Sequence, residues 1–291
     1  MSFAAVQRIL GILLTVFSLT LLPPFVLALL AQDGAAVAFA TAFALTLGVG
    51  ILSWLPVRGM KRELRLRDGF IVVVMFWTVL SAIGALPFVL ADNPHLSLTD
   101  AVFESVSGLT TTGATVITSL DGLPMSILYY RQQLQWLGGM GIIVLAVAVL
   151  PMLGIGGMQL YRAETPGPMK DNKLTPRITE TAKALWYIYL GLTVACGFSY
   201  WLAGMSVFDA VGHAFSTVAI GGFSTHDASM GYFNSPLIDM IAVVFMFLAG
   251  VNFSLHFVAF RHRSVTGYWQ DSEFRFYVCL LYTSPSPRDH G

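Results

Sequence analysis

Two short segments rich in glycine and threonine carry residues that could bind a cation. They are Thr110-Thr111-Thr112-Gly113 and Ala219-Ile220-Gly221-Gly222. Successive backbone carbonyl oxygens of such a segment can replace the hydration shell of an ion. Glycine helps because, without a Cβ atom, it reaches backbone angles that let carbonyls point to one side. The side chains differ between the two segments while the final glycine is kept, which favours ligation by the backbone.

The two segments belong to one unit that occurs twice. Residues 100–115 return without a gap, shifted by 109 positions, as residues 209–224. Each copy is introduced by Ser-x-x-Asp, at Ser97 and at Ser206, which is a capping signature for a helix N-terminus. Only about ten residues separate that signature from the Gly/Thr-rich segment, half of what crossing a bilayer takes. We therefore expect a half-helix that enters the membrane from outside and stops partway.

A half-helix followed by non-helical backbone predicts a lining for an ion pathway. Such backbone is tolerated at membrane depth only where it is buried in protein or faces a watery cavity. The carbonyl end of each half-helix would favour cations over anions. One Thr-Thr-Thr-Gly alone could equally be a turn that ends a helix, but two matching copies favour the filter. Glu104 and His213, which are equivalent in the repeat, are interpreted as structural polar residues near the outer mouth.

The elements that must position these segments are membrane helices. Hydrophobic residues make up 56% of the chain and charged residues 11%, and the mean hydropathy is +0.72, which excludes a soluble globule. The sequence predicts an all-α polytopic membrane protein built of repeated helix, pore half-helix, filter and helix units, as in potassium channels. The apolar runs, each long enough to cross a bilayer, are 9–31, 35–57, 69–91, 132–161, 184–208 and 240–260.

The distribution of lysine and arginine predicts the orientation. These residues gather in every second connection, at 58–67, 162–183 and 261–275. The positive-inside rule then places the N-terminus in the cytoplasm and both Gly/Thr-rich segments at the outer face. Arg131 is the one Lys or Arg predicted on the outer side, and we expect it at the surface. Nucleic acid is a poor partner for basic loops with membrane flanks, and Cys196 and Cys279 are interpreted as small apolar fillers.

These patterns divide the chain into consecutive parts. We expect two N-terminal transmembrane helices, a first pore unit, a cytoplasmic loop, a second pore unit, the start of a truncated third unit and an atypical polar tail. Their bounds are 1–67, 68–161, 162–183, 184–262, 263–282 and 283–291.

Three polar or flexible features inside the apolar runs have more than one interpretation. The glycines of residues 138–141 could form a hinge or a close packing surface, and packing is slightly favoured. Gln132, Gln133 and Gln135 could hydrogen-bond the filter backbone or face lipid headgroups. Asn252 is expected to face the bundle or the pore, because a polar amide in a membrane run is costly.

The sequence resembles the Trk/Ktr/HKT superfamily of potassium transporters. The resemblance is carried by residues 107–115, 132–141, 219–224 and 250–253 and extends over about residues 3–277. It implies potassium uptake across a bacterial inner membrane, with or without a coupled ion, and places Gly113 and Gly222 at the selective filter positions. It also implies no cofactor, a homodimer and a cytosolic nucleotide-binding regulatory subunit, TrkA. The loop 162–183 could contact that subunit or be plainly solvated.

The family pattern has four pore units, whereas two are found here. A third unit begins, but Pro285 and Pro287 cannot lie in an intact helix interior, so we expect a truncated chain. One alternative function is therefore a non-conducting fragment of such a transporter. Another is a polytopic membrane enzyme, which we do not expect because the sequence contains no His-Glu-x-x-His and no Gly-x-Ser-x-Gly motif.

Overall fold

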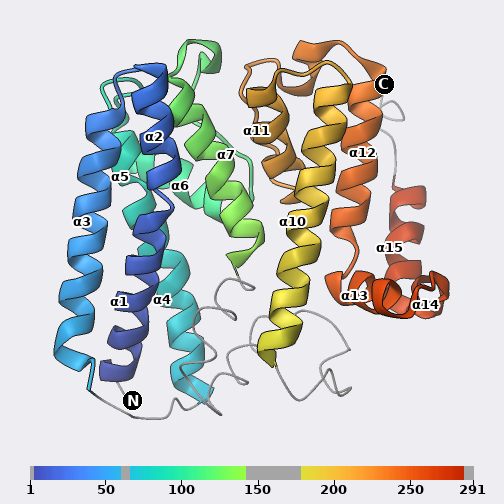
Figure 1. The fold of residues 1–291 in the computed structure, drawn as a ribbon, viewed down its shortest axis with the longest axis horizontal. Helices are drawn as coiled ribbons and strands as arrows, with labels where there is room; N and C mark the ends of the chain where they lie inside the picture. The colour runs from blue at the N-terminus through green and yellow to red at the C-terminus, as the bar shows by residue number, and fades with distance from the viewer. Residues whose placement is uncertain (1–2, 60–65, 142–177, 285–291) are drawn as a thin grey trace.

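The computed structural model describes residues 3–59, 66–141 and 178–284, and within these ranges all regular structure is helical (Figure 1). The α-helices are α1 Phe3–Leu19, α2 Leu22–Ala31, α3 Ala36–Trp54, α4 Leu66–Gly84, α5 Leu86–Leu90, α6 Leu98–Leu109, α7 Met125–Gly139, α10 Ile178–Leu202, α11 Val207–Val218, α12 Pro236–Gly250, α13 Phe253–His262, α14 Thr266–Gln270 and α15 Ser272–Thr283. Short 3-10 turns cover η1 Leu55–Val57, η2 Leu120–Gly122 and η4 Ser229–Phe233. The expected all-α membrane architecture is confirmed.

Four helical stretches among the described residues are long and apolar enough to span a membrane. They are Phe3–Ala31, Ala36–Val57, Ile71–Leu90 and Lys183–Leu202, and each corresponds to a predicted run. The fourth predicted run, 132–161, begins inside α7, and its part after residue 141 lies outside the described residues. Most of the predicted loop 162–183 also lies outside them, but α10 already begins at Ile178.

The last predicted run, 240–260, is not one straight span. It consists of α12 and α13, whose axes are bent by 94° at the break between them. A Cβ atom at Gly250 would lie 2.3 Å from the Tyr277 hydroxyl, so the aromatic ring of α15 packs directly on the end of α12. Asn252 lies in the break and donates to the Glu273 carboxylate at 3.2 Å, rather than facing the inside of a continuous span.

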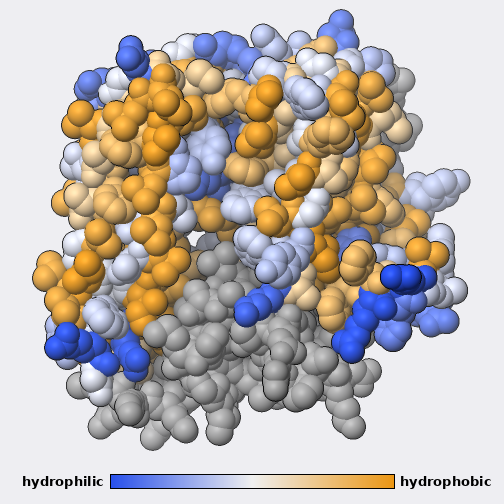
Figure 2. Space-filling model, in the orientation of Figure 1, coloured by the Kyte–Doolittle hydropathy of each residue, from blue (hydrophilic) through white to orange (hydrophobic). Residues whose placement is uncertain are grey.

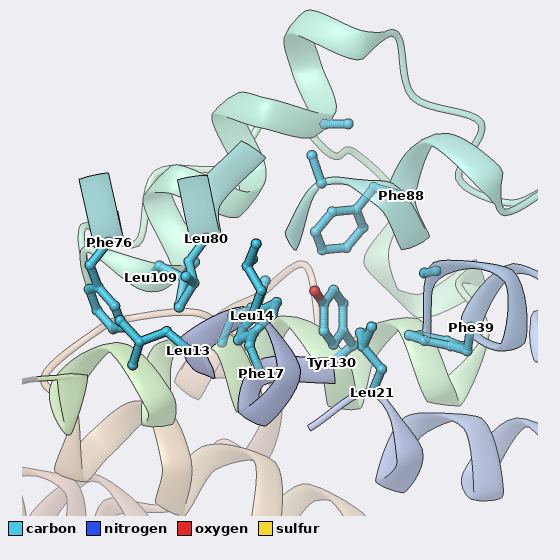
Figure 3. Packing of buried hydrophobic residues seen from close by; sticks show 14 of the residues in the cluster. Leu13, Leu14, Phe17, Leu21, Phe39, Phe76, Leu80, Phe88, Leu109 and Tyr130 are labelled. Atoms are coloured by element: carbon cyan, nitrogen blue, oxygen red, sulfur yellow. The ribbon is translucent and has the colours of Figure 1, made fainter. Parts of the chain in front are cut away.

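The described helices pack around two large apolar cores, and a smaller cluster contains Ile117, Leu120 and Leu128. Side chains from all the helices α1 through α7 form the first core, and side chains from α7, α10, α11 and α12 form the second. Tyr130 of α7 is fully buried in the first core, with its ring 5.5 Å from that of Phe39 and 5.3 Å from that of Phe88 (Figure 3). Its hydroxyl donates to the Gly84 carbonyl at 2.9 Å. The buried aromatic therefore ties the first pore unit to the two N-terminal helices.

The outer surface of the helices is strongly apolar. Figure 2 shows hydrophobic side chains along both halves of the molecule and hydrophilic ones mainly at its ends and in the hollow between the halves. Exposed apolar side chains of this kind are what lipid would cover. Of the two cysteines, Cys196 is a buried filler as expected, whereas Cys279 is exposed, because α15 leaves that face uncovered.

Candidate functional site

Both predicted half-helices are present, and both are capped in the same way. Helices α6 and α11 have 12 residues each. The Ser97 hydroxyl accepts the Asp100 N–H at 3.2 Å and donates to the Asp100 carboxylate at 2.8 Å. Ser206 and Asp209 repeat the arrangement at 3.1 Å and 2.7 Å. The capping signature predicted from Ser-x-x-Asp is therefore confirmed in both copies.

Each half-helix ends in the same left-handed turn. The Thr112 N–H donates to the Ser107 carbonyl at 2.9 Å, and the Gly221 N–H donates to the Ser216 carbonyl at 2.8 Å. Such bonds from the second residue after the C-cap back to the last turn of the helix define a Schellman ending. The left-handed residue of that ending is Thr111 in one copy and Ile220 in the other, with φ of 54° and 53°. The segment is thus both a helix-ending turn and the start of the predicted filter.

A second left-handed residue follows two positions later in each segment. Gly113 has φ of 77° and Gly222 has φ of 85°. Left-handed residues at every second position permit successive carbonyl oxygens to face the same side, as a carbonyl-lined filter requires. The left-handed backbone at both glycines is compatible with the predicted filter.

The first left-handed position is strained, because its occupant is not glycine. Thr111 and Ile220 are β-branched, and such residues rarely adopt positive φ. Each costs about 1–3 kcal/mol, and strain of this size persists at functional sites where surrounding structure enforces it. The same strain at two equivalent positions points to a backbone shape that matters more than local stability.

The two segments meet directly. A Cβ atom at Gly113 would lie 2.0 Å from the Gly221 carbonyl oxygen, so no side chain fits there. The predicted residues of the first segment therefore lie beside those of the second, although 109 positions separate them in sequence. Thr110, Thr112 and Gly222 remain exposed, while Ala219 and Gly221 are buried.

Three glutamines of α7 are buried, and one of them contacts the second segment. The Gln135 side-chain oxygen accepts the Phe223 N–H at 3.0 Å, and a Cβ atom at Gly221 would lie 2.3 Å from Gln135 Cδ. Gln133 donates to the Thr20 carbonyl at 2.8 Å. Gln132 is also buried. Contact with lipid headgroups is therefore wrong for all three, and Gln135 bonds the backbone one residue beyond the predicted filter segment 219–222.

The glycines at the end of α7 are packing residues. A Cβ atom at Gly138 would lie 2.0 Å from the Leu109 carbonyl oxygen, and one at Gly139 would lie 2.7 Å from the Tyr189 hydroxyl and 3.1 Å from Ala219 Cα. The end of α7 thus fits against the ends of both half-helices, which supports the packing interpretation over the hinge.

Glu104 and His213 anchor the chain just beyond each Gly/Thr-rich segment. The Glu104 carboxylate accepts the Thr115 hydroxyl at 2.9 Å and the Val116 N–H at 3.2 Å. The His213 ring bonds the Ser224 hydroxyl at 2.9 Å through Nε2. Thr115 and Ser224 are equivalent in the repeat. The two polar residues therefore perform the same structural task, in agreement with their interpretation as structural groups.

Arg131 is not at the surface, and that prediction is wrong. Its side chain is fully buried, with Nε 2.7 Å from Glu104 Oε1. One Nη donates to the Ser224 carbonyl and the other to the Thr115 hydroxyl, both at 3.1 Å. The guanidinium also lies 4.3 Å from the centre of the Phe223 ring. Its position near the start of α7 suggested exposure, but α7 packs against both α6 and α11.

Arg131 is the residue at this site that the sequence indicated least. It bonds residues that follow both Gly/Thr-rich segments, so one buried charge contacts both copies of the repeat. A signal was present, because Arg131 is the one cation predicted on the outer side and Glu104 is the one acid within a half-helix beyond its first turn. Pairing them would have required knowing that the two helices touch.

The loops that follow the two Gly/Thr-rich segments contact each other. His226 Nδ1 lies 2.6 Å from Asp121 Oδ1, and the Asp227 carboxylate accepts the Leu120 N–H at 2.9 Å. The His226 ring stacks on Tyr232 with 3.5 Å between centres. The hydrogen bond from His226 lowers the pKa of the Asp121 carboxyl below its ordinary value. The loop after the first filter is thereby joined to the loop after the second.

A family model described as "TrkH: Cation transport protein" matches residues 35–285. The Trk system potassium uptake protein TrkH of Vibrio parahaemolyticus is 60% identical over 98% of this chain and 62% of its own length. Its counterpart in Escherichia coli K12 is 57% identical over 97% of this chain and 59% of its own length. The Trk system potassium uptake protein TrkG of the same strain is 46% identical over 94% and 57%.

The fold has a matching solved structure. The crystal structure of the potassium transporter TrkH from Vibrio parahaemolyticus superposes with a TM-score of 0.83 at 57% identity, over 96% of this chain and 57% of that one. The chain spans about three fifths of the length of the curated relatives it matches.

Proposed function

The chain belongs to the TrkH family of cation transport proteins, and from that premise we propose that its two filter segments bind and conduct potassium ions in a bacterial potassium uptake system. The binding groups are the backbone carbonyls of residues 110–113 and 219–222. The observation that carries the proposal is the repeated pair of left-handed residues, Thr111 with Gly113 and Ile220 with Gly222. Carbonyl-lined filters replace the water around a cation in this way.

The electrostatics of the site supports a cation. Helices α6 and α11 both end at the filter segments, so the partial negative charge of each helix end faces them. The buried charge of Arg131 is balanced by Glu104 at 2.7 Å. The arginine therefore adds no net repulsion beside a potassium ion.

The remaining proposals concern the setting of the protein. The basic connections, 58–67, 162–183 and 261–275, face the cytoplasm by the positive-inside rule, which places the N-terminus inside and the filter mouth outside. The membrane is the bacterial inner membrane. By family resemblance, two copies pair as a homodimer and a cytosolic nucleotide-binding subunit, TrkA, regulates transport. The protein transports an ion and is not an enzyme.

Growth of a bacterial strain without potassium uptake systems tests the proposed function. The chain is expressed alone and also joined to the remaining C-terminal part of an E. coli relative, and rubidium uptake is measured beside growth at limiting potassium. We expect the joined form to restore both, and Gly113→Ala in the same form to abolish them. Membrane-inserted protein that restores neither growth nor rubidium uptake in either form would refute the proposal.

A further inference from the structure

A large groove lies away from the filter, between α10 and α13. Helices α13 and α14 lie at the same end of the molecule as the N-terminus (Figure 1). The volume of the groove is about 1260 Å³, larger than the roughly 300–1,000 Å³ typical of sites for small ligands. Apolar side chains dominate its lining, including those of Ile188, Leu192 and Phe257. A ligand that fills it must be long and largely apolar.

The groove also has a positive end. Arg261 and Arg263 line it, and no acidic residue does so among the described residues. The acids that follow in the sequence are already engaged, because Asp271 accepts the Phe274 N–H at 2.8 Å and Glu273 accepts the Asn252 amide at 3.2 Å. The two exposed guanidinium groups therefore offer hydrogen bonds to an anion from outside the described chain, and arginine suits phosphate in particular.

The surrounding helices have the features of a membrane interface. Helix α13 turns by 94° from α12, and the apolar side chains beside the arginines are largely exposed, with 85% for Phe260, 71% for Val265 and 64% for Trp269. Exposed aromatic residues next to arginines are typical of segments that lie in the headgroup region. The positive end of the groove is thus placed at the depth of lipid phosphates.

We propose that this groove binds one anionic phospholipid of the cytoplasmic leaflet. The phosphate contacts Arg261 and Arg263, and an acyl chain lies along α10 past Gly191. A Cβ atom at Gly191 would have no heavy atom within 4 Å, so the helix leaves open space there. The leaflet follows from the orientation proposed above, but lipid binding is measured without any transport, so the two proposals can fail separately.

The headgroup contact is tested with purified chain in detergent. Dioleoyl phosphatidylglycerol or dioleoyl phosphatidylcholine is added, and bound lipid is counted by native mass spectrometry. We expect the chain to retain phosphatidylglycerol preferentially, and Arg261→Gln/Arg263→Gln to reduce that preference roughly 30-fold. The control Arg58→Gln/Arg67→Gln removes the same charge from another basic connection and should leave the preference unchanged. Equal retention of the two lipids by the unaltered chain would overturn the proposal.

The acyl-chain contact is tested by filling the groove. Gly191→Leu should lower retention of phosphatidylglycerol while keeping both arginines, and a leucine in place of a helical glycine should not weaken the helix. Gly48→Leu is the matched control, because Gly48 also lies in a membrane helix with open space around its Cβ position. If Gly191→Leu changes the oligomeric state but leaves lipid retention intact, the groove binds protein and not lipid.

Discussion

Gly113 and Gly222 share a left-handed backbone but differ in their surroundings. A Cβ atom at Gly113 would meet the Gly221 carbonyl oxygen at 2.0 Å, whereas one at Gly222 would meet nothing within 4 Å. An alanine at either position bears a backbone cost of about 1–2 kcal/mol. We predict that Gly113→Ala also displaces the Gly221 carbonyl and so reduces both thermal stability and its increase on adding potassium more than Gly222→Ala does.

Gly34 provides the control for that comparison. Its φ is 86°, and nothing lies within 4 Å of its Cβ position, as at Gly222. Gly34→Ala should lower the melting temperature about as much as Gly222→Ala does, and it should leave the response to potassium unchanged. Equal effects of Gly113→Ala and Gly222→Ala would show that the contact between the two segments does not matter.

The pair of Glu104 and Arg131 supports a second prediction at the residue scale. Glu104→Gln leaves a buried guanidinium without its countercharge, which costs about 3–5 kcal/mol. We predict that Glu104→Gln/Arg131→Gln is much less destabilised than the sum of the two single variants, as measured by denaturant unfolding in a double-mutant cycle. Strictly additive losses would mean that the two charges do not stabilise each other.

The sequence predicted individual residues where the repeat itself supplied a comparison. The two capped half-helices and the equivalence of Glu104 with His213 could be inferred because each copy restricts the interpretation of the other, whereas the ion-binding role of the segments stays a prediction. Arg131 could not be placed in this way, since its partners come from both units and from a helix packing that no local pattern encodes.

At the scale of helices, the caps of α6 and α11 should contribute equally to the free energy of unfolding. The Ser97 and Ser206 hydroxyls accept N–H groups at 3.2 Å and 3.1 Å. Replacing either serine with alanine should cost about 1 kcal/mol of folding free energy, measured by chemical unfolding. Ser199→Ala is the control, because that hydroxyl only bonds the Ala195 carbonyl of its own helix. A cap variant no weaker than this control would contradict the prediction.

The contact between the two outer loops should depend on pH. Hydrogen bonding to His226 lowers the pKa of Asp121 from its ordinary value of 3.8 in the folded state. Its contribution to stability is therefore present above about pH 4 and is lost as the pH falls through the lowered pKa. We predict that Asp121→Asn lowers the melting temperature at pH 7 and that this difference disappears in acid.

A nearby carboxyl provides the control for the loop contact. Asp92 is exposed in the loop after α5, and Asp92→Asn should change the melting temperature little at either pH. If the difference in melting temperature between the unaltered chain and Asp121→Asn stayed the same in strong acid, the loop contact would not depend on the charge of Asp121.

Helices were predictable from the sequence where their own residues determine them. Serine caps, apolar runs and the length of the half-helices are local signals, and the corresponding helices are present. The bend between α12 and α13 was missed because the prediction rested on hydropathy, and α12 and α13 are both rich in apolar residues. The contact of Tyr277 with Gly250 joins the end of α12 to α15, and no local pattern indicates it.

At the scale of the whole molecule, close helix packing holds the N-terminal helices to the rest. A Cβ atom at Gly50 of α3 would lie 2.7 Å from the Thr15 hydroxyl and 2.8 Å from its backbone nitrogen. We predict that Gly50→Ala forces α1 and α3 apart and lowers stability by about 1–3 kcal/mol, measured by thermal unfolding. Gly48→Ala on the same helix has open space and should be neutral or slightly stabilising. Equal stability of Gly50→Ala and Gly48→Ala would show that α1 and α3 do not pack closely at Gly50.

The position of Arg131 makes the two copies of the repeat unequal. Helices α7 and α12 follow equivalent half-helices and have 15 residues each, yet their seventh residues are Arg131 and Ala242. The second copy therefore depends on the first for the charge that bonds the Ser224 carbonyl. A chain built from two second copies would lack that bond, so the copies are not interchangeable parts.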